Sequence, residues 1–341
     1  MSLRNAGLAL LGLFTVSVQS AYSADVSGGQ AITIDAERVG FSRLSSSETQ
    51  FGKLLWRGGL ALESSDPRFG GFSGLEISAN GKRVIAVSDQ GWWLAADLVH
   101  QGEQLTGVSN ARMAPILTKS GKRSGKKSKR DAEALAAFDA RKTDGPLLVG
   151  FERRERVELF DLTKAGLKAR PGLIKSPKAI SSGPRNGELE SLLRIWEGPF
   201  ASWYLAISEK NFDPAGNIRG WRWKGGQTVE FGIARHEDYR ITDIAILPGG
   251  RDIVTLERSF SSGSLPGMAM RRFNLKDLKP RQPAKGVKLL EARQPFFAID
   301  NMEGLAVHQT RDGETRLTMI SDDNYNRTVQ TTLLFQFAIK D

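Results

Sequence analysis

Short runs of aliphatic, β-branched and aromatic residues recur along the chain, and turn-forming residues bound each run. Runs of this kind occupy residues 83–87, 147–149, 203–207 and 317–320. The turns beside them include Asn80-Gly81, Asp144-Gly145 and Pro248-Gly249-Gly250. Little helical periodicity interrupts this pattern. Short β-rich runs punctuated by tight turns indicate strands joined as hairpins, so the sequence predicts an all-β protein.

The chain also contains an internal repeat. Five segments share an acidic or polar residue followed by a small residue and an aliphatic one, at residues 72–75, 132–135, 189–192, 242–245 and 302–305. Their second residues are 60, 57, 53 and 60 positions apart. A second polar cluster follows each of them after 14 to 19 residues, at residues 88–90, 151–153, 208–210, 256–258 and 321–324. A unit of this length with two or more hairpins is typical of a four-stranded propeller blade.

We therefore expect a single β-propeller, with a β-sandwich or a pair of small β-domains as the alternative. Residues 24–341 divide into between five and six units of this length. Six blades are expected, because residues 53–56 form a further candidate strand that has no polar cluster of its own. The C-terminal run at residues 332–337 is also strand-like. Pairing between the two ends of the chain would close the ring and remove its free edges.

The first residues have the pattern of a secretory signal peptide. Arg4 precedes an apolar run at residues 6–18, which is shorter than the roughly 20 residues needed to span a bilayer. The small residues Ala21 and Ser23, which flank Tyr22, predict cleavage before Ala24, so residues 1–23 are expected to be removed and residues 24–341 to form one domain. An uncleaved anchor is the alternative. The chain contains no cysteine and no later apolar stretch of spanning length, and a periplasmic or secreted location is expected.

Much of the formal net charge of +10 lies in one segment. Residues 119–130 hold a Gly/Ser-spaced basic run without apolar residues, whose cations are Lys119, Lys122, Arg123, Lys126, Lys127, Lys129 and Arg130. Such a run is typical of a solvated, mobile surface loop. The alternative is a peripheral tether to anionic lipid headgroups, polysaccharide or phosphate-rich ligands, since clustered positive charge attracts anions. Nucleic acid is not expected as a partner, and the sequence does not predict an oligomeric state.

The two sets of polar clusters supply the candidate functional residues. In regular hairpins both sets would lie on one rim, so their carboxylates would converge at the mouth of the central channel. Carboxylates gathered in a partly dry funnel repel one another, and their hard oxygens favour Ca²⁺ or Mg²⁺ over a soft metal. No organic cofactor is expected. The predicted metal ligands are Asp89, Glu152, Glu209, Asp243, Glu257, Asp322 and Asp323.

The predicted catalytic carboxylates are Glu133, Glu190 and Glu303, and Arg153 and Arg258 are predicted to clamp an anionic small molecule or envelope ligand. The three glutamates would act as metal ligands or general bases, while the two arginines hold the substrate. His308 ends the strand that follows Glu303 and is a weaker candidate for approaching the site. The alternative is that the acids serve folding alone, through salt bridges and hydrogen bonds between blades.

The paired clusters resemble those of a known family, whose domain is described as having the esterase-like activity of phytase. The matching segments are Ser73-Gly74-Leu75 with residues 86–89, residues 131–135 with 151–153, and residues 186–192, 256–258, 300–305 and 321–324. The resemblance implies hydrolysis of phosphoesters or other esters, with the recurrent Glu and Asp residues at the site. The basic run before Asp131 departs from the family pattern. A non-enzymatic propeller that binds an envelope glycan, a lipid headgroup or a protein is the alternative.

Overall fold

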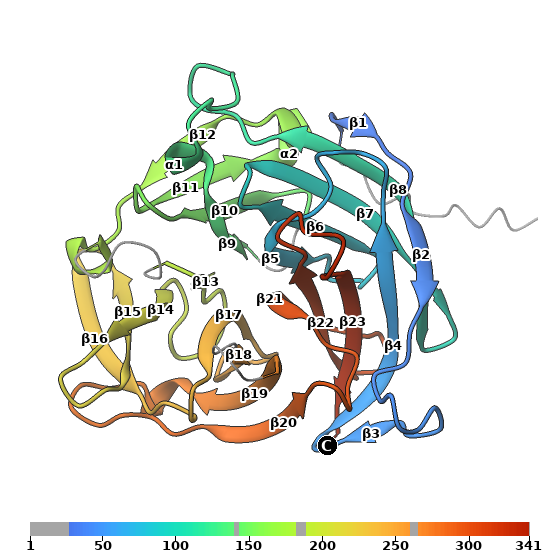
Figure 1. Ribbon diagram of the computed structural model, residues 1–341. Helices are drawn as coiled ribbons and strands as arrows, with labels where there is room; N and C mark the ends of the chain where they lie inside the picture. The colour runs from blue at the N-terminus through green and yellow to red at the C-terminus, as the bar shows by residue number, and fades with distance from the viewer. Residues whose placement is uncertain (1–26, 140–142, 182–188, 260–264, 341) are drawn as a thin grey trace, which may run out of the picture.

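Five antiparallel sheets stand like blades around a central axis, so the chain forms a single all-β propeller, as predicted (Figure 1). This computed structural model describes residues 27–139, 143–181, 189–259 and 265–340. The predicted signal peptide at residues 1–23 lies outside the described residues. Within the described part, no helix is long and apolar enough to cross a membrane.

The first three blades follow one another along the chain, and each is given from its innermost strand outwards. Blade 1 contains β5 (Phe72–Ile77), β6 (Arg83–Ser88), β7 (Trp92–Gln101), β8 (Gln104–Pro115) and the short β1 (Gln30–Ala31). Blade 2 contains β9 (Ala132–Ala137), β10 (Pro146–Phe151), β11 (Arg156–Asp161) and β12 (Pro171–Ile174). Blade 3 contains β13 (Ser191–Arg194), β14 (Tyr204–Phe212), β15 (Ile218–Lys224) and β16 (Gln227–Ile233).

The last two blades bring the chain back to its beginning. Blade 4 contains β17 (Arg240–Ile246), β18 (Asp252–Ser259), β19 (Gly267–Asn274) and β20 (Val287–Arg293). Blade 5 contains β21 (Asn301–Gln309), β22 (Thr315–Asp322), β23 (Thr332–Ile339), β4 (Leu54–Glu63) and β2 (Asp35–Arg38), with β3 (Gln50–Phe51) paired to β4. The short helices α1 (Lys127–Arg130) and α2 (Leu162–Ala165) lie in the connections around blade 2.

Blade 5 is built from both ends of the chain. The N-terminal strand β4 pairs antiparallel with the C-terminal strand β23, from Leu54 opposite Ile339 to Leu62 opposite Thr332. The expected closure is therefore confirmed, but the expected six blades are wrong, because the structure has five. The strand candidate at residues 53–56 has no polar cluster of its own because it begins β4, the fourth strand of the blade that already carries the cluster at residues 302–305.

Aromatic side chains fill the seam where the two ends of the chain meet. Phe335 and Phe337 of β23 are fully buried, and Phe337 lies 5.0 Å from Phe41 and 4.8 Å from Trp56 between ring centroids. Both contacts are edge-to-face, the arrangement that aromatic quadrupoles favour. The same apolar cluster includes side chains of blade 4, such as Leu256. Closure of the ring therefore depends on packing as well as on the hydrogen bonds of the β4–β23 ladder.

Four of the five innermost strands carry a β-bulge close to their first residue. The residues left unpaired by these bulges are Ser73, Glu133, Thr242 and Glu303. In blade 3 the equivalent residue is Glu190, which directly precedes β13. A bulge removes a side chain from the ordinary alternation of a strand and re-aims it. The backbone thus presents one side chain per blade at the start of each innermost strand, and three of these five are glutamates.

Candidate functional site

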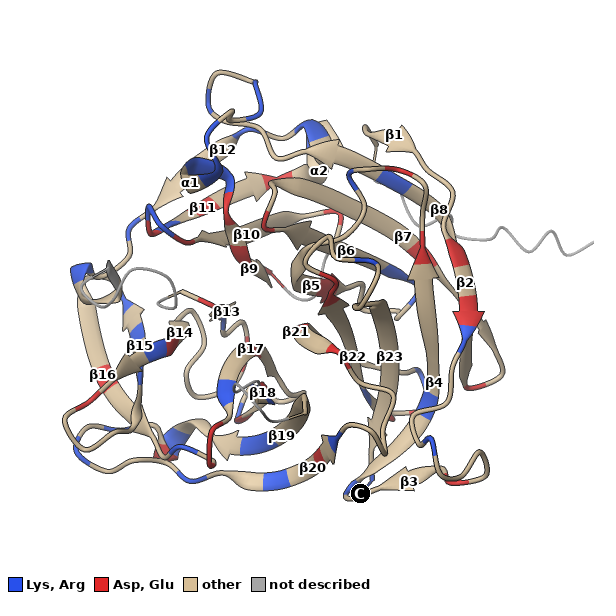
Figure 2. Ribbon diagram, in the orientation of Figure 1, with Lys and Arg blue, Asp and Glu red and all other residues tan. Residues whose placement is uncertain are grey.

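The two sets of polar clusters meet on one rim of the propeller, as the repeat predicts. The start of each innermost strand lies beside the end of the next strand, in the pairs Phe72–Ser88, Ala132–Phe151, Ser191–Ile207, Ile241–Glu257 and Asn301–Asp322. Figure 2 shows acidic positions on β9 and on β14 in red. The two clusters of a blade become neighbours because their strands pair antiparallel. The innermost strand leaves the rim, and the next strand of the hairpin returns to it.

Glu133, Glu190 and Glu303 come from three different blades and are close enough to repel one another. Burial raises the pKa of Glu133 well above its usual range, and the charges of Glu190, Asp131 and Glu303 raise it further. Burial also raises the pKa of Glu190 well above normal, and Glu209 and Glu303 add to the effect. Burial raises the pKa of Glu303 even though the positive charge of Arg258 opposes the change. These acids, from the starts of three innermost strands, therefore lie near one another.

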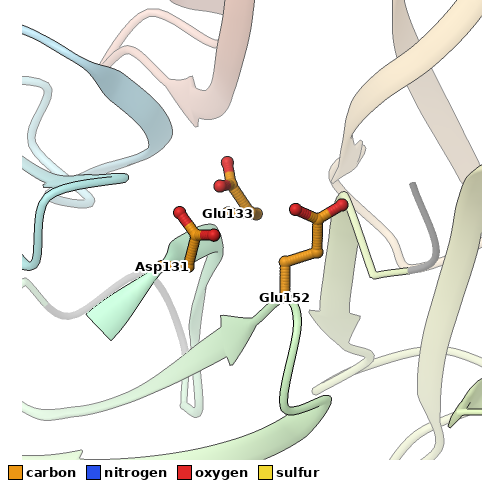
Figure 3. A group of neighbouring side chains, drawn as sticks. All are labelled: Asp131, Glu133 and Glu152. Carbon is orange, nitrogen blue, oxygen red and sulfur yellow. The ribbon is translucent and has the colours of Figure 1, made fainter. Parts of the chain in front are cut away.

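Three carboxylates of blade 2 form the tightest group. Asp131, Glu133 and Glu152 each offer an oxygen within 4.8 Å of the others, and Figure 3 shows the three side chains gathered in one space. Asp131 was not among the predicted site residues, although it stands two positions before Glu133. Its proximity to Glu133 in sequence is the signal that could have identified it. Asp131 is also almost completely buried, with 1% of its surface exposed.

Two cations approach this group from its solvent side. Lys127 of α1 contacts both Asp89 and Asp131, and its Nζ lies 3.1 Å from Asp131 Oδ1. Arg153 lies in the turn after β10 with φ 58°, and its Nε lies 2.6 Å from Asp131 Oδ2. The predicted anion clamp Arg153 is thus at the site, with 42% of its side chain exposed. The basic run at residues 119–130 was predicted as a mobile loop, but the structure docks it onto the rim.

Arg258 links the acids of blades 3 and 5. Its Nη2 donates to Glu209 Oε1 at 3.0 Å, and its Nη1 lies 3.4 Å from Glu303 Oε1 and donates to Asn301 Oδ1 at 2.5 Å. Burial works against the ionised form of Arg258, but the charges of Glu303 and Glu209 outweigh burial and raise its pKa. Lys210 also pairs with Glu209, at 2.5 Å. Arg258 therefore holds the predicted position at the mouth, already engaged by two carboxylates.

Asp322 and Asp323 complete the rim on blade 5. Burial raises the pKa of Asp322 well above its usual range, and the negative charge of Glu303 adds to this. Asp323 Oδ1 accepts hydrogen bonds from the backbone N–H groups of Gly71 at 3.0 Å and Tyr325 at 3.1 Å. Gly71 has φ 65°, and a Cβ at its position would lie 2.6 Å from Asp89. Asp323 thus orders the loop that joins blade 5 to blade 1, while Asp322 faces the other acids.

Asp243 does not occupy the position that the repeat assigned to it. Thr242, not Asp243, is the bulged residue of β17 that corresponds to Glu133 and Glu303. Asp243 is completely buried, and its carboxylate accepts the backbone N–H groups of Ile244 at 2.8 Å and Leu305 at 2.7 Å. The sequence alignment of blade 4 was therefore wrong by one residue, and Asp243 ties blade 4 to blade 5 rather than facing the channel mouth.

Glu257 and His308 also lie apart from the carboxylate group. Glu257 accepts a hydrogen bond from Arg271 Nε at 2.7 Å, within the sheet of blade 4. The alternation of β18 sends Glu257 to one face and its neighbour Arg258 to the other, which places only Arg258 at the mouth. His308 is buried near the opposite end of β21, next to the turn at Gly81. Its expected approach to the site is wrong.

The model of the phytase-like family, described as having the esterase-like activity of phytase, matches residues 67–325. This span includes all five innermost strands and every carboxylate of the rim. The chain belongs to the phytase-like family. The comparison with curated proteins finds no match.

Solved structures similar to this phytase-like protein are propellers with little sequence identity. The Dos1 propeller is 12% identical, with a TM-score of 0.34, and the match covers 75% of this chain and 54% of that one. The phytase-like chain thus spans about half of the Dos1 chain. The propeller domain of Cps50 (Swd1) from Myceliophteria thermophila is 9% identical, with a TM-score of 0.39, over 90% of this chain and 99% of that one.

The raised pKa values of the rim predict how stability responds to pH. An acid whose pKa is raised in the folded state binds more protons there than in the unfolded chain, so stability falls as pH rises through the folded-state pKa. In EDTA, Glu133→Gln should therefore leave the phytase-like protein more stable than wild type at pH 8, because glutamine carries no charge for burial and the neighbouring carboxylates to oppose. Near pH 5 the two should be nearly equal. Urea unfolding at both pH values measures the difference.

Comparing variant with wild type also removes the contribution of His100, whose pKa is lowered by burial and which acts in the opposite direction. A Glu133→Gln variant less stable than wild type at pH 8 in EDTA would show that the buried carboxylate already has a compensating partner.

Proposed function

We propose that this protein is an exported hydrolase of phosphoesters or other esters, which acts outside the cytoplasm after loss of residues 1–23. The observation that carries the proposal is the group of Asp131, Glu133 and Glu152, whose oxygens lie within 4.8 Å of one another at the channel mouth. Glu190 and Glu303 lie beside it, and Arg153 and Arg258 border it. Membership of the phytase-like family supports the choice of reaction.

The chemistry of the donor set fits a hard divalent cation. Carboxylate oxygens are the ligands that Ca²⁺ and Mg²⁺ prefer, and a charged cluster in a partly buried site needs a counter-charge. No cation of the described residues forms an ion pair with Glu133 or Glu190. Asp131, Glu133 and Glu152 are the residues that would hold the cation. It would supply Lewis acidity toward a phosphoryl or carbonyl oxygen.

The chain's own residues would position the substrate and move the proton. Arg153 is the more exposed arginine, and its planar guanidinium suits a phosphate or carboxylate group of the substrate. Glu190 carries a raised pKa and no ion-pair partner among the described residues, so we assign it the role of the base that accepts a proton from the attacking water. Arg258 would hold Glu209 and Glu303 in a fixed orientation.

The proposal predicts Ca²⁺-dependent release of nitrophenol from p-nitrophenyl phosphate or p-nitrophenyl acetate. EDTA should abolish the activity, and Glu133→Gln, Glu190→Gln and Glu303→Gln should each lower kcat by about 100-fold or more, the usual contribution of a general base or its equivalent. Steady-state kinetics on the purified variants measure this. Glu230→Gln is the matched control, because Glu230 lies on the outer strand β16 and 45% of its side chain is exposed.

If wild type is active and all three rim variants hydrolyse the substrate at the same rate, the proposed site is excluded. Ca²⁺ binding without turnover on any ester tested would instead favour a propeller that binds its ligand and does not hydrolyse it. Detection of the precursor and of a mature protein beginning at residue 24, by mass spectrometry of cell fractions, tests the export step separately.

A further inference from the structure

A groove lined mainly by cationic side chains lies beside the carboxylate group on blade 2. It is formed between the connection that runs from β8 through α1 to β9 and the β10–β11 hairpin, and it has a volume of about 320 Å³. Figure 2 shows the basic positions of α1 in blue next to blade 2. The charged residues that line the groove are Lys119, Lys129, Arg130, Arg154, Arg156 and Glu158. Its floor includes the apolar side chains of Ile116 and Phe151.

Two of the arginines are held in place by hydrogen bonds to uncharged groups, and Arg156 also pairs with Glu158. Arg130 donates to the backbone carbonyls of Ser124 at 3.3 Å and Gly125 at 3.0 Å, and to the Gln90 side chain at 3.1 Å. Arg156 donates to the backbone carbonyl of Lys129 at 2.6 Å, and its guanidinium lies 3.8 Å from the centre of the Phe151 ring. Such contacts fix a guanidinium without neutralising it, so the groove is ordered before any ligand arrives.

The positive charge of the groove is largely uncompensated. Glu158 is the single acid among the lining residues, and it pairs with Arg156 at 3.0 Å. Lys119, Lys129 and Arg154 are exposed, and none of them forms an ion pair with an acid of the described chain. This separates them from Lys127 and Arg153, which the rim carboxylates already engage. Five cations facing one carboxylate leave a net charge of about +4 in a space the size of a small molecule.

We propose that this groove binds a ligand bearing two or more phosphate groups. Both walls supply cations, since Lys119 and Lys129 belong to the basic run and Arg154 belongs to the hairpin opposite. A single phosphate would leave one wall unpaired, whereas a ligand with spaced phosphates contacts both. Guanidinium groups bind phosphate oxygens in pairs of parallel hydrogen bonds, and several phosphates supply the negative charge that matches the net charge of the groove. The proposal is independent of the hydrolase proposal, because it concerns binding outside the carboxylate group.

Isothermal titration calorimetry with inorganic tripolyphosphate in EDTA tests the groove without any contribution of a divalent cation. Wild type is expected to bind tripolyphosphate far more tightly than inorganic phosphate, with an affinity that falls steeply as salt is raised. Lys129→Gln and Arg154→Gln are each expected to weaken binding about tenfold. Lys126→Gln is the matched control, since Lys126 is exposed in the same basic run but does not line the groove. Melting temperatures of the variants verify folding.

Free oligophosphates and phospholipid headgroups share this chemistry, and a second arm distinguishes them. Sedimentation with cardiolipin vesicles, whose headgroup carries two phosphates, against phosphatidylcholine vesicles reports binding to a membrane surface. If wild type binds the vesicles but not tripolyphosphate, and Lys129→Gln and Arg154→Gln lose vesicle binding, the groove is supported and its ligand is a lipid headgroup. Equal weakening by Lys126→Gln would mean diffuse attraction to the basic run and would overturn the proposal. Binding of neither probe by wild type would overturn it as well.

Discussion

Deletion of residues 331–341 is expected to yield a chain without a cooperative unfolding transition. The deletion removes β23, which lies in the middle of blade 5 between β22 and β4. Both neighbours would become exposed edges, and β4 would lose its only link to the inner strands of its blade. The loss also empties the space of Phe335 and Phe337, each of which would by itself cost about 3–5 kcal/mol if truncated to alanine. Together these two losses, about 6–10 kcal/mol, are comparable with the whole stability of an ordinary domain, about 5–15 kcal/mol.

Thermal denaturation followed by circular dichroism measures this effect, together with the fraction of protein recovered in soluble form. Deletion of residues 340–341 alone is the control, because these positions follow the last residue of β23. The control should melt within a few degrees of wild type. An unchanged melting temperature after deletion of residues 331–341 would show that the ring does not depend on closure by both ends of the chain.

Arg258→Met is expected to destabilise the protein by about 3–5 kcal/mol at pH 8, the usual cost of breaking a buried ion pair by removing one partner. Methionine approximates the length of the arginine stem but leaves Glu209 and Glu303 without their shared cation. Glu209 is 1% exposed, so water cannot replace the lost contact. The penalty should shrink as pH falls, because burial raises the pKa of Glu303 and its protonation removes uncompensated charge. Urea unfolding at pH 8 and pH 5 measures both effects.

Two further variants make this prediction specific. Adding Glu209→Gln to Arg258→Met should recover part of the loss, since the double variant buries one charge fewer. Arg272→Met is the matched control, because Arg272 pairs with Asp252 on the outer part of blade 4 with 47% of its side chain exposed. Exposed pairs contribute only about 0–1 kcal/mol. Equal losses in Arg258→Met and Arg272→Met would mean that Arg258 is not an essential counter-charge of the rim.

The basic run shows how local pattern and tertiary context can disagree. Its composition predicts a solvated loop, yet Arg123 donates to the Gln90 carbonyl at 2.6 Å and lies 4.3 Å from the centre of the Trp92 ring. Lys127 reaches Asp131 four residues later, an i,i+4 spacing that could have suggested the contact. Charge runs are ambiguous in sequence because the partners that order them, here on blade 1, are remote along the chain.

The sequence by itself determined the all-β class, the repeat, the closure by both ends and the shared rim of Glu133, Glu190 and Glu303. These features follow from strand composition, turn residues and the constant length of a hairpin, all of which are local. The tertiary structure alone decided the number of blades. In the sequence, the N-terminal strand β4 resembles the start of a sixth blade, and only its pairing with β23 assigns it to blade 5. It also decided that Thr242 rather than Asp243 occupies the bulge of blade 4. A shift of one residue turns a side chain to the other face of a strand, and only pairing with the neighbouring strand fixes that register.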